Sequence, residues 1–417
     1  MESNLKTISS FGARGSLLLL FAFPIYPLPV TNIIFISFAF FSLLSWVSTK
    51  CPSIWKALGR NIIFALPFAP YLIELCFYHS NAVVGFEVEK KLLFFTAPFA
   101  FAFYTSSLKL FNFRVYIRTF CISMILLSVY SILLLITNKI LFDPAYYAGD
   151  ASTLRIKFED IARLHPTYFG LFASISMLWL IYDHKNLTRK LKWISGFSIC
   201  ILLFVDVLIA AKMSLIILFA GTVVILYKTT TQKKHLVIPY GVLLAVFTIL
   251  IVVIPSSRER LYEMIHILYS KNVTYNSVNE RKIIFNCSWN IFKNNIWLGV
   301  GCRNTQQFLN AFYWSIQYYP AFIKNYNSHN QFLTLGLNYG IFDVFLFLGS
   351  IGAVLYRQRK NIFAIVLIGS IVMIMLTESI LERQMGVYFF ALFTLLLFNI
   401  DRREESAKSL IETSTTN

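Results

Sequence analysis

Apolar segments of membrane-spanning length recur along this chain, and they constrain its fold more than any other feature. A spanning helix needs about 20 mostly apolar residues. Segments approaching that length cover residues 15–30, 31–48, 61–79, 90–106, 113–137, 165–183, 192–210, 212–229, 236–254, 330–355, 361–378 and 385–401. Pro24, Pro27 and Pro29 interrupt the first two, so a count of eleven spans stays open beside twelve. The sequence predicts an all-α polytopic membrane protein with about 12 transmembrane helices.

Positive charge alternates between the two ends of these segments. The net charge is +17, although only 14% of the residues are charged and 57% are hydrophobic. The cations lie in loops after every second span: Lys50, Lys56 and Arg60; Lys109, Arg114 and Arg118; Lys185, Arg189, Lys190 and Lys192; Lys228, Lys233 and Lys234; Arg357, Arg359 and Lys360; Arg402 and Arg403. Loops rich in Lys and Arg stay in the cytoplasm, so both termini are predicted to be cytoplasmic. Because the cations do not gather on one soluble face, we expect no nucleic-acid binding.

One membrane domain, residues 1–403, is expected, followed by a flexible cytoplasmic tail at 404–417. A large external insertion covers residues 255–328, and capping signals predict that it is helical. Ser256 to Glu259 and Ser277 to Glu280 both have the spacing of a capping box. The sequence Gly299-Val300-Gly301 then predicts a helix end and a turn. Cys287 and Cys302 lie in this insertion, and a disulfide between them is left open.

Cations and histidines at external membrane edges are the candidate functional residues. They are Arg163, His165, Lys212, Arg281 and His329, the last followed by Asn330. A diphosphate on a lipid would explain such a group, since Arg grips phosphate with two hydrogen bonds and Lys acts as a point charge. Histidine can exchange a proton near neutral pH. Each residue also has a structural explanation: snorkelling for the cations, an ion pair with Glu280 for Arg281, and helix capping or packing for the histidines.

An ordered set of short motifs favours the functional explanation of these residues over the structural one. Asn327-Ser328-His329-Asn330 opens a span, with Gly340 about ten residues on. Arg163 to Gly170 precedes a middle span. Asn279-Glu280-Arg281 is followed by the glycine turn of residues 296–301. Together, over about residues 140–400, these motifs resemble the O-antigen ligase and O-antigen polymerase superfamily. Ala211 to Ser214 occupies the place of a Ser-Arg pair in that superfamily.

The resemblance implies a membrane glycosyltransferase of the GT-C type that faces the periplasm from a bacterial inner membrane. Its donor would be a glycan on undecaprenyl diphosphate. The acceptor would be lipid A–core in the ligase branch, which we favour, and another lipid-linked repeat unit in the polymerase branch. No metal and no other cofactor is expected.

The resemblance also implies roles for individual residues. Arg281 and Lys212, which replaces the family's arginine, would stabilise the leaving diphosphate, with Arg163 as a further diphosphate contact. His329 would be the general base of an inverting transfer, with Asn330 and His165 in support. A secondary transporter or lipid flippase is the alternative of another class, in which Asp206, Glu74 or Asp343 would be the ion site.

Overall fold

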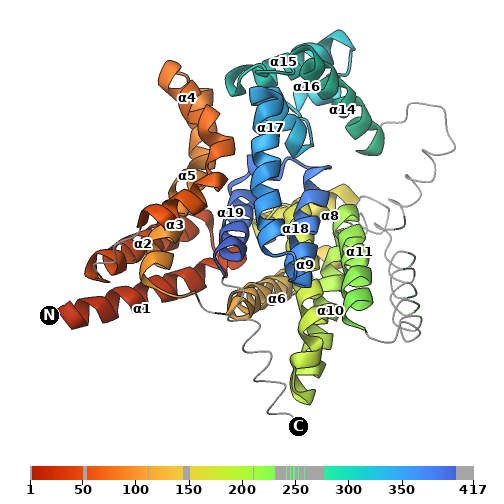
Figure 1. The fold of residues 1–417 in the computed structure, drawn as a ribbon. Coiled ribbons are helices and arrows are strands. Elements are labelled where there is room, and N and C mark those ends of the chain that lie inside the picture. The colour runs from red at the N-terminus through yellow and green to blue at the C-terminus, as the bar shows by residue number, and fades with distance from the viewer. Residues whose placement is uncertain are drawn as a thin grey trace.

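The computed structural model of this protein describes residues 2–49, 54–110, 112–143, 151–209, 211–230 and 277–400, with isolated positions between 241 and 258. Within these ranges the chain is helical and forms no strand (Figure 1). The helices before residue 231 are α1 (Glu2–Leu20), α2 (Leu28–Thr49), α3 (Ile54–Asn61), α4 (Ala69–Phe77), α5 (Ala82–Ser107), α6 (Phe113–Thr137), α8 (Ala151–Ala162), α9 (Pro166–Asp183), α10 (Arg189–Leu208) and α11 (Lys212–Thr229). Those after residue 276 are α14 (Ser277–Asn294), α15 (Cys302–Ser315), α16 (Tyr319–Ile323), α17 (Gln331–Arg357), α18 (Ile362–Met375) and α19 (Gln384–Asn399).

Five of the described helices are long and apolar enough to cross a bilayer: α2, α6, α10, α11 and α17. Two bent pairs raise the number to seven if each pair is one span. One pair joins Ile54–Phe64 to Leu66–Phe77 at 54°, and the other joins Thr153–Ala162 to Pro166–Asn186 at 68°. α18 and α19 are apolar but shorter. The prediction of an all-α membrane protein is therefore confirmed, whereas the count of twelve spans stays a prediction.

The difference between the two counts has identifiable causes. The predicted span 236–254 lies almost entirely outside the described residues. α5 begins at Ala82, eight residues before the predicted span, and its first turns carry Glu87, Glu89, Lys90 and Lys91. These charges lower its apolar character below that of a simple spanning helix. The predicted break near Pro24 is present, since a short 3-10 helix, η1 (Phe23–Ile25), separates α1 from α2.

Two helices that are buried on every side, α9 and α19, form the centre of the molecule. All residues of α9 from Tyr168 to Trp179, and all residues of α19 from Gly386 to Leu397, are buried. A helix that is apolar on every side is stable only when other elements surround it. α6, α10 and α11 pack around α9, and α5 packs on α19. Figure 1 shows both helices in the middle of the bundle.

α14, α15 and α16 form a lobe at the top of Figure 1, which we call the helical lobe. The predicted helix start at Ser277 is confirmed. The first predicted helix of the insertion, from Ser256, lies outside the described residues. Ile284, Cys287 and Ile291 of α14 are buried in a small core shared with α15 and α17, whereas Phe285 and Trp289 are exposed and stack on each other. Cys287 and Cys302 are buried and do not form a disulfide.

Three glycines attach the helical lobe to α17 through main-chain atoms. The Val300 and Gly301 amides donate to the carbonyls of Leu337 and Asn338, at 2.7 and 3.0 Å. The amide of Ile341 donates to the carbonyl of Ile296 at 2.8 Å. A Cβ on Gly340 would lie 2.0 Å from the carbonyl oxygen of Trp297, and one on Gly299 would lie 2.5 Å from that of Leu337. Gly299, Gly301 and Gly340 all have positive φ, which glycine adopts without strain.

Candidate functional site

Two of the predicted residues, His329 and Arg281, meet at one carboxylate that the sequence did not single out. His329 Nδ1 lies 3.1 Å from Oε2 of Glu378. The Arg281 guanidinium forms a short ion pair with Oε1 of the same residue through Nη2. The three residues are separated by 49 and 97 positions in the sequence. The helical lobe, the start of α17 and the segment after α18 therefore converge at Glu378.

The start of α17 explains how His329 is held. Asn330 caps the helix, since its Oδ1 accepts the Leu333 amide at 3.0 Å. Its Nδ2 donates to the Leu376 carbonyl, also at 3.0 Å, and so attaches the cap to the segment that carries Glu378. His329 itself has φ of 47°, an uncommon value for a residue with a side chain. In the His-Asn pair, Asn330 therefore caps the helix, and the left-handed backbone of His329 directs its ring to Glu378.

The charges around Glu378 favour its ionised form. Glu378 lies after the end of α18, and its side chain is 14% exposed. Burial by itself would raise the pKa of this carboxyl, but the His329 hydrogen bond and the Arg281 charge outweigh burial and hold the pKa below its ordinary value of 4.5. An ionised carboxylate accepts a hydrogen bond from Nδ1–H, which leaves Nε2 of a neutral His329 as the acceptor for another group.

Residues 376–383, which we call the 376–383 connection, are held from several sides. Ser379 Oγ lies 2.8 Å from Thr334 Oγ1, and the Leu381 amide donates to Gln331 Oε1 at 2.8 Å. Three other helices also contact the connection. Tyr168 of α9 donates to the Ile380 carbonyl at 2.9 Å, and Glu159 of α8 pairs with Arg383 at 3.1 Å. Lys90 and Lys91 of α5 each bind Glu382 at 3.2 Å. The position of Glu378 therefore depends on four helices besides the lobe.

A cavity of about 770 Å³ lies beside this connection. Its charged or histidine lining residues are Glu159, Arg163, His165 and Arg383; its apolar lining comes mainly from Pro24, Ile25, Leu28, Leu126 and Leu127. His165 is the N-cap of α9, with Nδ1 accepting the Thr167 amide at 3.3 Å, and it is close enough to Glu378 to interact with it electrostatically. The cavity is thus amphipathic, with cations next to apolar helix surface.

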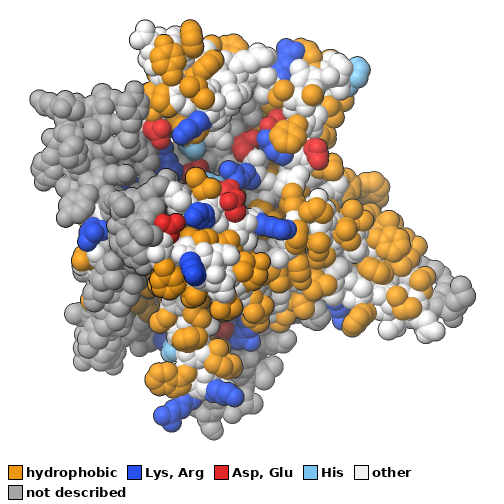
Figure 2. All heavy atoms as spheres, turned by 180° about the vertical axis from the view of Figure 1, so that it is seen from behind, with side chains coloured by type: hydrophobic (Ala, Val, Ile, Leu, Met, Phe, Trp, Pro, Cys, Tyr) orange, Lys and Arg blue, Asp and Glu red, His pale blue; other side chains and the backbone are white. Residues whose placement is uncertain are grey.

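The surface seen from behind the view of Figure 1 shows where charged and apolar side chains gather. Figure 2 shows apolar side chains over the broad body of the molecule, whereas most of the visible Asp and Glu side chains gather in a band below the helical lobe, among Lys and Arg. A charged band next to an apolar body is the arrangement expected where a membrane meets water.

Lys212 begins α11, directly after the turn that follows α10. It is partly buried. Across this turn, Ser214 of α11 donates to Asp206 Oδ1 of α10 at 2.6 Å. Gly170 of α9 lies so close that a Cβ on it would clash with both side chains. The turn is therefore packed tightly against α9, the helix that His165 caps.

Comparison with known proteins adds one decisive finding. Residues 197–348 match the family model of the O-antigen ligase. These residues form a domain of the O-antigen ligase and polymerase superfamily. No curated protein matches the chain. Together with the several apolar helices of spanning length, this match indicates a multi-pass membrane protein that contains a region similar to the O-antigen ligase.

The ligase domain contains some of the site and not the rest. Lys212, Arg281, His329, Asn330 and Gly340 lie inside the matched range. Arg163 and His165 precede it, and the 376–383 connection follows it. The contacts at Glu378 therefore join residues of the matched range to residues outside it.

Glu378, Glu382 and Arg383 are the residues that sequence reasoning missed. Glu378 was counted as the last residue of an apolar span, so its charge was not weighed. The available signal was electrostatic, because partly buried cations at a membrane edge need counter-charges. Glu378 and Glu382, two acids within five residues at the end of the second span after His329, meet that need.

Two of the three acids considered for a transporter, Glu74 and Asp206, have hydrogen-bond partners inside the protein. Glu74 accepts the amides of Cys302 and Arg303 at 3.0 and 3.4 Å, so it caps α15 from a distant helix. Asp206 accepts from Ser214. Asp343 is buried and has no hydrogen-bond partner among the described residues. Nowhere in the described part of the chain do three His, Cys, Asp or Glu residues gather as they would around a metal.

Proposed function

We propose that this protein is an O-antigen ligase-like glycosyltransferase that moves a glycan from undecaprenyl diphosphate to lipid A–core. The reaction would take place on the periplasmic face of a bacterial inner membrane, with both termini in the cytoplasm. One observation carries the proposal: His329 and Arg281, a base and a cation, are fixed on the same carboxylate.

His329 would be the general base. Its Nε2 takes the proton of the acceptor hydroxyl while the hydroxyl oxygen bonds to the anomeric carbon of the donor sugar. The bond from that carbon to the diphosphate oxygen breaks, and the lipid diphosphate leaves with the electron pair. Attack opposite the leaving group inverts the anomeric centre.

Glu378 would orient the base and would not replace it. A carboxylate whose pKa is held below 4.5 is a weak base at neutral pH. Ionised Glu378 stabilises the imidazolium that forms when His329 accepts the proton, as the carboxylate does in a serine-protease triad. Its ion pair with Arg281 keeps it ionised.

Positive charge would stabilise the leaving diphosphate. Arg281 uses Nη2 for Glu378, and its side chain is 42% exposed, so a guanidinium with five N–H groups retains donors for an anion. Lys212 would add a point charge rather than a planar fork. Arg163, at the cavity, would be a third contact, and the apolar side of that cavity suits the chain of a lipid.

The polymerase alternative uses the same donor and differs in the acceptor. A deletion strain, rescued with the native chain or with His329→Ala, separates the two. A ligase deletion leaves bare lipid A–core while long polymer accumulates on undecaprenyl diphosphate, and the native chain alone restores capped core. Core capped with a single repeat unit would identify a polymerase instead. Full rescue by His329→Ala would remove the proposed base.

A further inference from the structure

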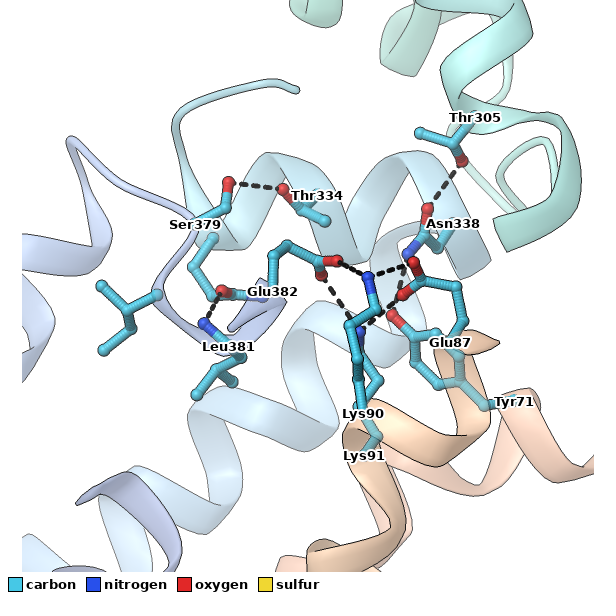
Figure 3. Close-up of polar contacts among 12 residues, drawn as sticks. Tyr71, Glu87, Lys90, Lys91, Thr305, Thr334, Asn338, Ser379, Leu381 and Glu382 are labelled. Atoms are coloured by element: carbon cyan, nitrogen blue, oxygen red, sulfur yellow. Dashed lines mark hydrogen bonds and ion pairs between the residues drawn. The ribbon is translucent and has the colours of Figure 1, made fainter. Parts of the chain in front are cut away.

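A cluster of four charged side chains lies between α5 and the 376–383 connection (Figure 3). Lys91 Nζ is 2.7 Å from Glu87 Oε2 and 3.2 Å from Glu382 Oε1. Lys90 Nζ is 3.2 Å from Glu382 Oε2 and also pairs with Glu87. Each lysine thus touches both carboxylates, and the four charges cancel.

The four charged side chains of this cluster are largely buried, which is energetically costly. The Lys91 side chain is fully buried, and the other three are 13–15% exposed. Taking charges out of water is costly, and a buried ion pair often stabilises a fold no better than apolar residues would. Fixing one geometry is the best-supported use of such a cluster, because its charges tolerate few alternative arrangements.

The geometry that is fixed here belongs to the segment carrying Glu378. Glu382 ends η7 (Ile380–Glu382), four residues after Glu378. Between them, Ser379 binds Thr334 and Leu381 binds Gln331, both in the first turn of α17 behind His329 (Figure 3). The lysines hold the far end of the segment, and α17 holds its middle. A shift of Glu382 would therefore move Glu378, because only three residues separate them and two of these are hydrogen-bonded to α17.

We propose that Lys90 and Lys91, acting through Glu382, are positioning residues that hold the Glu378 carboxylate against His329. α5 lies outside the matched ligase domain, so this role assigns a part of the active site to the first third of the chain. The inference rests on the proposed function of His329 as the base. It adds that the strength of that base is set from α5.

The test is the pH–rate profile of glycan transfer by the purified full-length protein, with a lipid diphosphate-linked glycan and lipid A–core as substrates. Glu378→Gln removes the carboxylate that stabilises the protonated ring, so the plateau falls and the acid limb moves to lower pH. Glu382→Gln should move the limb in the same direction with about a tenfold loss of kcat, as for an outer partner of a functional ligand. The double variant should lose no more than Glu378→Gln alone, because both act through one group.

Two further variants separate positioning from folding. Asp183→Asn removes a buried carboxylate that pairs with Arg118 at 2.7 Å in another part of the bundle, and it should leave the acid limb in place. Glu382→Asp keeps the charge but withdraws the carboxylate by one methylene, and it should give an intermediate shift if Glu382→Gln does not fold. An unmoved limb in the Glu382 variants, or losses that add in the double variant, would overturn the positioning role. Absence of transfer by the native protein would instead count against the proposed function.

Discussion

At the scale of single residues, Arg281 has two tasks, holding Glu378 and meeting the leaving diphosphate. We expect Arg281→Ala to lower the rate of transfer by about 10²–10³-fold, as for the loss of one donor to a developing negative charge. Lys282→Ala is the matched control, because Lys282 is the next residue of α14 and its side chain is exposed. Initial rates with saturating lipid-linked donor measure the effect. Equal rates for the two variants would contradict the role of Arg281.

The lowered pKa of Glu378 predicts a pH dependence of stability. Because the folded state holds this pKa below its ordinary value of 4.5, the ionised group stabilises the fold at pH values above about 4.5. That contribution is lost as the pH falls through the lowered pKa. The Tm of the native protein should therefore exceed that of Glu378→Gln near pH 7, and the gap should close toward pH 3. Thermal unfolding in detergent across this range measures it; a constant gap would contradict the coupling.

Residue types at membrane edges, together with the family resemblance, made His329 and Arg281 candidates, and their roles stay predictions. The structure adds that both contact one carboxylate. Glu378 was not predictable in the same way. Its significance comes from contacts with residues 49 and 97 positions away, and local pattern carries no information about such distances. The predicted span 361–378 included Glu378, whereas α18 ends at Met375, so the carboxylate lies outside the helix.

At the scale of elements, the crossing of α17 with the helical lobe predicts an asymmetry between two glycines of one helix. Gly340→Ala would place a Cβ 2.0 Å from the Trp297 carbonyl at a residue with φ of 80°, and a non-glycine residue there costs about 1–3 kcal/mol in backbone strain before the clash is relieved. Gly349→Ala, in the same helix, has open space and should leave Tm unchanged or slightly raised. Thermal unfolding of both variants is the measurement. Equal stabilities would show that the crossing is not tight.

Helices were the most predictable feature of the fold. α6 and α11 have the predicted bounds, 113–137 and 212–229, because continuous apolar runs are bounded there by polar residues. α5 was predicted too short, since the charges of its first turns look like loop residues until Glu382 is brought beside them. The bends before α9 and α4 were not predicted, because a bend depends on what the helix packs against.

At the scale of the whole molecule, the alternation of cations predicts which parts face the cytoplasm. A cysteine at Gln317, in the exposed turn after α15, should react with a membrane-impermeant maleimide in intact spheroplasts. A cysteine at Lys190, exposed at the start of α10, should react only after lysis. Both are placed in a background lacking Cys51, Cys76 and Cys200. The reverse labelling pattern would place the helical lobe in the cytoplasm and end the proposal of periplasmic transfer.

The cavity is the feature that no stretch of sequence reveals. Its lining comes from η1, α6, α8, α9 and the start of α19, so it exists only when distant parts of the bundle assemble. Arg163 and His165 were predicted as external residues, but their shared cavity with Arg383 was not. Assembly of this kind is the reason that candidate residues can be found from sequence while the space between them cannot.

The glycine crossing has a consequence for how the protein can change. Main-chain hydrogen bonds join the lobe to α17, from the Val300 and Gly301 amides to the Leu337 and Asn338 carbonyls and from the Ile341 amide to the Ile296 carbonyl. This part of the joint does not depend on which side chains the lobe carries. Side chains on the outer surface of α15 and α16 can therefore diversify, by natural drift or by design, without moving the lobe over the bundle. A lobe transplanted from a similar protein should retain its position provided that it carries Gly299 and Gly301 and that α17 keeps Gly340.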